Sequence, residues 1–121
     1  MTQYHYTRDK AYAFDAGDNN KAFAYTSKDD FSRACISFID VDGERKITKN
    51  SESDIVFYVT TGEGTIVVNG TAFAVKATDS VIVPKNVEFG YFGKMGLVEF
   101  MTPSWVEGSD IEINKSPRDH V

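Results

Sequence analysis

Residues 65–75 of the chain read TIVVNGTAFAV, which is two short runs of apolar and β-branched residues joined by Asn69 and Gly70. Both central residues of a type I′ turn have a positive φ, a backbone conformation that asparagine and glycine adopt at low cost. The stretch therefore predicts a β-hairpin with strands at 65–68 and 71–75.

Runs of the same kind recur on both sides of this hairpin. They are rich in Val, Ile, Phe, Tyr and Thr, they are separated by Gly, Asn and Asp, and none sustains the period of a helix. Further strands are predicted at 34–41, 44–47, 56–60, 80–83, 88–92 and 97–101. Asp42-Gly43 predicts a second hairpin between the first two of these, whereas 26–33 is either a turn of helix or a loop. The pattern indicates an all-β sandwich or barrel.

The composition limits the classes of protein to consider. The chain has 121 residues, 41% of them hydrophobic and 26% charged, as expected of one soluble domain. Its longest apolar runs, such as 55–59, are far too short to span a bilayer. The formal net charge is -5 and the basic residues form no stripe, so no nucleic acid partner is expected. The N-terminus has no basic region followed by an apolar segment, so we expect a cytoplasmic protein that does not contact a membrane.

Two distinctive side chains are expected to have structural roles. Cys35 is the only cysteine and lies in an apolar stretch, so it cannot form an intramolecular disulfide and is expected in the core. Trp105 follows Pro103, just after the last predicted strand, and is expected to cap a barrel end or a dimer interface rather than to contact a substrate.

From Gly43 onward, the spacing of residues resembles that of the cupin family. The first cupin motif is Gly, five residues, His-x-His, three residues, Glu, six residues and Gly, and it falls here on Gly43, Lys49, Ser51, Ile55 and Gly62. The second motif is Gly, five residues, Pro-x-Gly, two residues, His, three residues and Asn, and it falls on Thr78, Pro84, Asn86, Phe89 and Gly93. The resemblance covers about 60 residues and includes the hairpin at Asn69-Gly70 between the two motifs.

The resemblance implies a fold and a domain organisation. The fold would be a single cupin-type β-barrel, also called a double-stranded β-helix or jelly roll, of the kind often dimeric through an N-terminal strand. Residues 1–30 would form an arm and strands that pack on the barrel or on a dimer partner, 31–103 the barrel, and 104–121 a polar segment. Because the tail at 114–121 has little to bury, we expect it to fray or to lie on a partner surface. A homodimer is the expected assembly.

The metal ligands of the family are not retained. Cupins that bind a metal use three histidines and one glutamate, and the matching positions hold Lys49, Ser51, Ile55 and Phe89. None of these side chains is a good ligand for a divalent ion. The only histidines are at the polar ends of the chain. Neither a metal nor another cofactor is therefore expected.

The resemblance also implies what would line the barrel. Residues two apart on a strand share a face, so Lys49 and Ser51 should project inward if they keep the orientation of the family's ligands. Phe89 and Tyr91 would do so from the opposing strand, and at least one of Phe57 and Tyr58 must be buried. Such a pocket would suit an anionic or aromatic ligand. We take Lys49, Tyr91 and Glu99 as candidate catalytic residues and Ser51, Phe57 and Phe89 as candidate ligand-binding residues.

Three of these residues also have a plainer interpretation, which is the expected one. Phe89 can be a plug that fills the barrel instead of a stacking platform. Lys49 lies in a stretch that is polar on both faces and can be solvated. Glu99 can face water while Val98 and Phe100 face the core.

Two functions from different classes remain open. The first is a metal-free cupin that binds a small organic molecule, either as a binding module or as an isomerase- or lyase-type enzyme that uses Lys49, Tyr91 or Glu99 for proton transfer. The alternative is a non-catalytic structural or regulatory dimer with a solid barrel. A barrel interior filled by Phe57, Phe89 and Tyr91 would remove the first.

Overall fold

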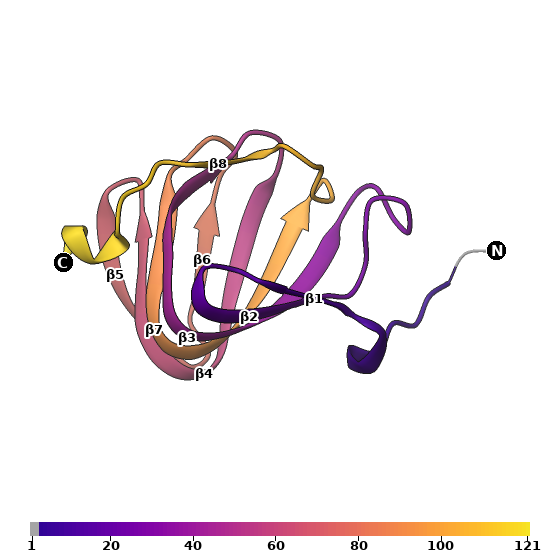
Figure 1. The fold of residues 1–121 in the computed structure, drawn as a ribbon, viewed down its shortest axis with the longest axis horizontal. Helices are drawn as coiled ribbons and strands as arrows, with labels where there is room; N and C mark the ends of the chain where they lie inside the picture. The colour runs from indigo at the N-terminus through magenta and orange to yellow at the C-terminus, as the bar shows by residue number, and fades with distance from the viewer. Residues whose placement is uncertain (1–2) are drawn as a thin grey trace.

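The computed structural model describes residues 3–121, and they form a single sheet of eight antiparallel strands (Figure 1). The strands are β1 (Tyr12–Asp15), β2 (Asp18–Ala24), β3 (Cys35–Asn50), β4 (Asp54–Val68), β5 (Thr71–Lys76), β6 (Ser80–Val83), β7 (Phe89–Thr102) and β8 (Asp110–Glu112). Two 3₁₀ turns, η1 (Arg8–Lys10) and η2 (Pro117–His120), lie near the ends. The predicted all-β class is confirmed.

The long strands give the sheet its barrel shape. The strand order is β1-β2-β3-β7-β4-β5, with β6 on β4 and β8 on β3, and the path does not close on itself. In Figure 1, β3, β4 and β7 each bend at the bottom of the view and so contribute to two facing layers. The space between the layers is the interior of the barrel.

The two predicted hairpins have opposite outcomes. Asn69 and Gly70 have φ values of 51° and 80° and connect β4 to β5, so the first hairpin is confirmed. The second is wrong, because Asp42 and Gly43 lie within the continuous strand β3, with Gly43 opposite Gly93 of β7. A Cβ on Gly43 would collide with the backbone carbonyl of Asp18. This glycine therefore permits the close approach of β2 rather than a turn.

A β-bulge in β3 decides which way its second half faces. Arg45 is paired with Tyr91 of β7, and Thr48 is paired with Phe89. These partners are two residues apart on β7 but three apart on β3, so β3 contains one extra residue. Directly paired residues share a face, so Arg45 and Thr48 both face inward and Lys49 faces away from the interior.

The interior beside β4 is filled with apolar side chains. The ring of Phe57 lies 5.7 Å from the rings of both Phe89 and Tyr91, centroid to centroid, and all three residues are at most 2% exposed. The buried side chains around them include Ile55, Val59, Ile66, Val83 and Leu97. Cys35 is buried, as expected.

The outer face of the same layer is also apolar. Ile36 is paired with Phe100 in β3 and β7, and Ile82 is paired with Val56 in β6 and β4. Val56 is paired in turn with Phe100, so the four side chains form one row across four strands. Ile36, Ile82 and Phe100 are 42%, 66% and 40% exposed. We call this row, together with the neighbouring Tyr58, the outer apolar row.

The C-terminal segment is ordered against the barrel. β8 pairs with β3, and Pro117 is buried. The Arg118 guanidinium lies 4.5 Å from the ring centroid of Phe92, and its Nε is 3.3 Å from Glu44 Oε1. The expectation that this segment frays was therefore wrong, because paired backbone and a cation over an aromatic ring hold it in place. The stretch 26–33 is a loop. Among the residues described, no helix has both the length and the apolar character needed to cross a membrane.

Candidate functional site

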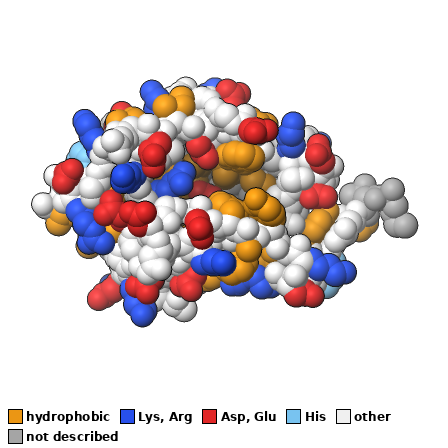
Figure 2. Space-filling view, viewed as in Figure 1, with side chains coloured by type: hydrophobic (Ala, Val, Ile, Leu, Met, Phe, Trp, Pro, Cys, Tyr) orange, Lys and Arg blue, Asp and Glu red, His pale blue; other side chains and the backbone are white. Residues whose placement is uncertain are grey.

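A cavity of about 800 Å³ opens on one side of the barrel. Figure 2 shows this face hollowed, with hydrophobic side chains around the hollow and charged ones beside them. The lining comes from η1, β1, the end of β2 and the loop after it, β3, β7, the segment before β8 and the first residue of β8, and no described residue of β4, β5 or β6 contributes. The interior thus has a filled half beside β4 and an open half beside β1 to β3. Lining residues include Ser37, Arg45, Phe89, Tyr91, Glu99, Trp105 and Asp110.

Aromatic rings separate the two halves. Phe89 and Tyr91 line the cavity, and Phe57 packs against both of them from the filled half. Phe89 therefore plugs part of the barrel and also forms a wall of the cavity. The barrel is not solid.

Glu99 faces the cavity. Its neighbours on the same face of β7, Leu97 and Met101, are buried, whereas Phe100 is 40% exposed on the outer face. The expectation that Glu99 faces water and Phe100 the core was therefore wrong, because this layer is apolar on both faces and alternation alone could not identify the inner one. Across the strands, Glu99 is paired with Ser37 of β3 and Phe57 of β4.

The surroundings of Glu99 favour its protonated form. Burial raises the pKa of this carboxyl from 4.5 to about 7, while the Arg45 guanidinium opposes the rise and the Asp110 carboxylate adds to it. The group can thus change its protonation state near neutral pH. Burial also raises the pKa of Tyr91, with Glu99 adding to the rise, so its phenol keeps its proton and remains a hydrogen-bond donor.

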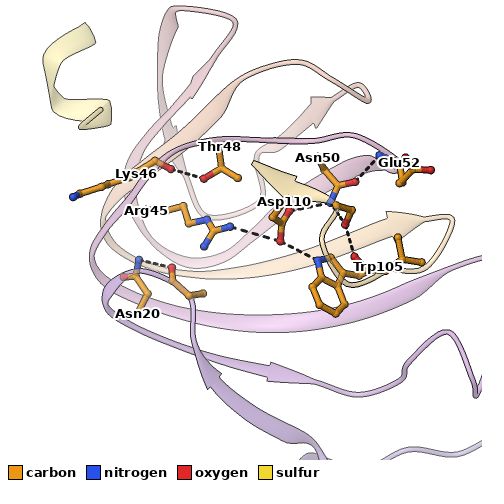
Figure 3. Close-up of polar contacts among 11 residues, drawn as sticks. Asn20, Arg45, Lys46, Thr48, Asn50, Glu52, Trp105 and Asp110 are labelled. Atoms are coloured by element: carbon orange, nitrogen blue, oxygen red, sulfur yellow. Dashed lines mark hydrogen bonds and ion pairs between the residues drawn. The ribbon is translucent and has the colours of Figure 1, made fainter. Parts of the chain in front are cut away.

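Asp110 is held by three neighbours at the wall of the cavity (Figure 3). Its Oδ1 accepts a hydrogen bond from Asn50 Nδ2 at 2.9 Å, and its Oδ2 accepts one from Trp105 Nε1 at 2.9 Å. Arg45 Nη2 lies 4.0 Å from the same Oδ2. The carboxylate is therefore fixed in position and ties residues from β3 and from the segment before β8 together.

The Arg45 guanidinium has N–H donors that are available to a ligand. Its Nη2 is 4.0 Å from Asp110 Oδ2, which is too long for a hydrogen bond, and among residues 3–121 the guanidinium makes no shorter polar contact. The side chain is 23% exposed and lines the cavity. A guanidinium carries several N–H donors in one plane and suits oxygen atoms that carry negative charge.

The predicted site residues lie in three environments. Tyr91, Glu99 and Phe89 come together in the cavity, whereas Phe57 lies behind it in the core. Lys49 faces away because of the β-bulge, contrary to the orientation expected from the motif. Ser51 also lies outside the cavity, in the turn after β3, with its Oγ 3.4 Å from Glu52 Oε2.

The lining residues that sequence reasoning missed include Ser37, Arg45, Trp105 and Asp110. Ser37 and Arg45 lie two and six residues from Ile39 along β3. They therefore share the inward face of this strand with Ile39 and Val41, which are buried. The even spacing was therefore a signal for both. No sequence signal placed Trp105 or Asp110, because only the pairing of β8 with β3 brings them to the cavity.

The four positions that match the family's metal ligands do not form a common site. Lys49 and Ser51 lie outside the cavity, Ile55 is in the core and Phe89 is a cavity wall. Across residues 3–121, no cluster of three or more His, Cys, Asp or Glu side chains is arranged to hold a metal ion.

Comparisons with known proteins agree with this fold. No family model and no curated protein sequence matches the chain. Among solved structures, a histidine-to-glutamine variant of Streptomyces Pac13 with uridine is 26% identical, with 96% of this chain and 99% of that chain covered and a TM-score of 0.85. Pac13 is described as a nucleoside dehydratase.

Two more distant structures have the same architecture. KdgF from Halomonas is 11% identical, with 86% of this chain and 96% of that chain covered and a TM-score of 0.73. An RmlC-like cupin from Shewanella frigidimarina is 23% identical over the same shares of the two chains, with a TM-score of 0.71. With its antiparallel sheet bent into facing layers around a ligand-sized cavity, this chain belongs to the cupin superfamily.

Proposed function

We propose that this protein is a dehydratase-type lyase that acts on a nucleoside or a molecule of similar size and shape in the open half of its barrel. The observation that carries the proposal is Glu99, a cavity-facing carboxyl with a pKa of about 7 beside a cationic Arg45. The similarity to Pac13 over nearly the whole chain supports the substrate class. A cavity of about 800 Å³ is within the range of small-molecule sites, about 300–1,000 Å³.

Glu99 would transfer the proton. As a carboxylate it would remove a proton from a carbon next to a carbonyl group of the substrate. The electron pair of that C–H bond would form a C=C bond, and the hydroxyl on the next carbon would leave. The leaving hydroxyl would take the proton back from Glu99 and depart as water, so the group ends as it began. A pKa near the working pH suits both halves of this cycle.

Arg45 and Tyr91 would stabilise the charge that develops in this reaction. Removal of the carbon-bound proton places negative charge on the carbonyl oxygen, and the Arg45 guanidinium offers N–H donors to it. Tyr91 lines the same cavity with a phenol that stays protonated. Among the described residues that line the cavity there is no histidine, so proton transfer here would rest on carboxyl and phenol groups.

The experiment that tests this function replaces Glu99 by glutamine, which keeps the size but cannot take up a proton. We expect kcat to fall about 10²- to 10⁴-fold. The assay is mass spectrometry for loss of one water from a panel of nucleosides and their carbonyl-bearing derivatives. Glu112→Gln is the matched control, because Glu112 is exposed on β8 outside the cavity. Full activity in Glu99→Gln, or no dehydration of any panel member by the wild type, would refute the proposal.

A second role, self-association, is favoured by the outer apolar row. Taking about 200 Å² for a fully exposed side chain of this size, its four exposed members present on the order of 400 Å² of apolar surface. Patches of this size on a monomer often mark an interaction site. A second copy of the chain can cover the row with its own identical row, as two-fold symmetry requires, which is the homodimer expected above.

Light scattering coupled to size-exclusion chromatography tests this assembly. We expect a dimer for the wild type and a monomer for Ile82→Lys, which places a charge at the most exposed member of the row, on β6. Ile111→Lys is the matched control, since Ile111 is 44% exposed on β8 and outside the row. A wild-type monomer, or a dimer that survives Ile82→Lys, contradicts this role.

A further inference from the structure

Trp105 occupies an unusual position for a tryptophan. It lies between β7 and β8, lines the cavity, and is 43% exposed. Large aromatic side chains are usually covered, because each can bury about 150–250 Å² of apolar surface. A half-exposed indole at the wall of a cavity therefore leaves apolar surface that a ligand could cover.

The indole is held in one orientation by a chain of hydrogen bonds. Its Nε1–H donates to Asp110 Oδ2, and Asp110 Oδ1 accepts from Asn50 Nδ2, each at 2.9 Å (Figure 3). Asn50 is 2% exposed, and its Oδ1 accepts from the backbone N–H groups of Glu52 and Ser53 at 3.0 and 2.8 Å. Each side chain in this series of hydrogen bonds is thus oriented by the next one, and the series ends at the backbone of the turn between β3 and β4.

The backbone on both sides of Trp105 is anchored as well. Ser104 donates from its backbone N–H to Ser32 O at 3.0 Å and from its hydroxyl to Phe31 O. Ser109 donates from its backbone N–H to Val106 O at 3.2 Å, and its hydroxyl accepts from Asn50 Nδ2 at 3.0 Å. The only polar atom of the indole is already paired, so what remains for a ligand is the flat apolar ring.

The same carboxylate also connects Trp105 to the reactive part of the cavity. Asp110 Oδ2 accepts from the indole and lies 4.0 Å from Arg45 Nη2. A ligand with its ring on Trp105 would therefore have its oxygen-bearing part near Arg45.

From this geometry we propose that Trp105 is the platform that binds the planar ring of the ligand, and that Asp110 is the positioning residue that orients the indole. The choice of ligand rests on the proposed function. The ligand class is a flat heterocyclic ring joined to a polar, oxygen-rich part. Stacking on the indole selects for the ring, because every such ring has a π-face, and the sugar alone has none.

The chain supplies its own reporter, since Trp105 is the only tryptophan. Uridine, adenosine and ribose are titrated into the full-length protein while tryptophan fluorescence is recorded. We expect saturable quenching by the two nucleosides and none by ribose. Quenching that is equal for ribose, or absent for both nucleosides, overturns the platform.

Calorimetry on variants then separates stacking from packing. Trp105→Leu should weaken nucleoside binding about 10- to 100-fold, whereas Trp105→Phe, which keeps a flat ring, should restore most of the affinity. Asp110→Asn should weaken binding and change the fluorescence of Trp105 in the free protein. Wild-type affinity in Trp105→Leu refutes the inference.

The two proposals fail separately. If nucleosides bind in a Trp105-dependent manner but are never dehydrated, the proposed function is wrong and the platform stands. If dehydration depends on Glu99 but not on Trp105, the platform is wrong and the function stands.

Discussion

The two halves of the barrel interior are made from the same sheet and differ in almost every other respect. The filled half beside β4 holds Phe57, Val59 and Ile66, none of them exposed. The open half holds Glu99, Arg45 and Asp110 around a cavity of about 800 Å³. The difference shows that a barrel can keep one half as a hydrophobic core and leave the other half free for charged groups, whose burial would otherwise be costly.

The largest effect should come from the filled half. Phe57→Ala removes a ring that packs on both Phe89 and Tyr91 and leaves a cavity in its place. We expect the free energy of unfolding to fall by about 3–5 kcal/mol, measured by chemical denaturation. Tyr58→Ala, one residue along and 43% exposed on the outer face, should cost much less. Equal losses in the two variants would mean that the filled half is not the stabilising core.

A smaller effect should come from the open half and depend on pH. The pKa of Glu99 is about 7 in the folded protein and 4.5 ordinarily, so between these values the folded state binds a proton that the unfolded state has released. Stability should therefore fall as pH rises from 4.5 to about 7, by on the order of 2 kcal/mol, since water in the cavity reduces the full effect.

Denaturation midpoints of the wild type and Glu99→Gln across this pH range test that effect. Glutamine does not titrate, so the decline should be smaller in the variant, while Glu112→Gln should keep the wild-type slope. Parallel curves for all three proteins would show that the pKa of the Glu99 carboxyl is not raised in the open half.

A change at Arg45 should separate binding from stability. Arg45→Lys keeps the charge but loses the planar set of donors, so we expect ligand affinity to fall about 10-fold with little change in unfolding free energy. Lys94→Ala, an exposed position on β7 outside the cavity, is the control. A loss of stability that equals the loss of affinity would assign Arg45 to the structure of the wall instead.

The smallest effect should come from Lys49, which belongs to neither half. Lys49→Ala should change unfolding free energy by less than about 0.5 kcal/mol and leave binding unaltered, because its side chain faces away from the interior. A large loss of activity would mean that the β-bulge does not orient β3 as described.

Sequence reasoning reached the fold more fully than the site. The hairpin at Asn69-Gly70 and the strand β6 were predicted correctly because turn residues and β-branched runs act over a few neighbouring residues. Phe89 and Tyr91 were also placed inside. The orientation of Glu99 was missed because Val98 and Phe100 are as apolar as a core strand would require, and only the layers around β7 distinguish the two faces.

Local patterns and residue identities were enough to predict an all-β cupin barrel and the lack of histidine at the family's ligand positions. Which side chains meet in the cavity depends instead on strand pairing between distant parts of the chain. Because of one extra residue in β3, the Lys49 side chain faces away from the barrel interior while the Arg45 side chain faces into it. Trp105 and Asp110 reached the cavity because β8 pairs with a strand about 60 residues earlier, a contact that depends on how the whole sheet bends rather than on any neighbouring residues.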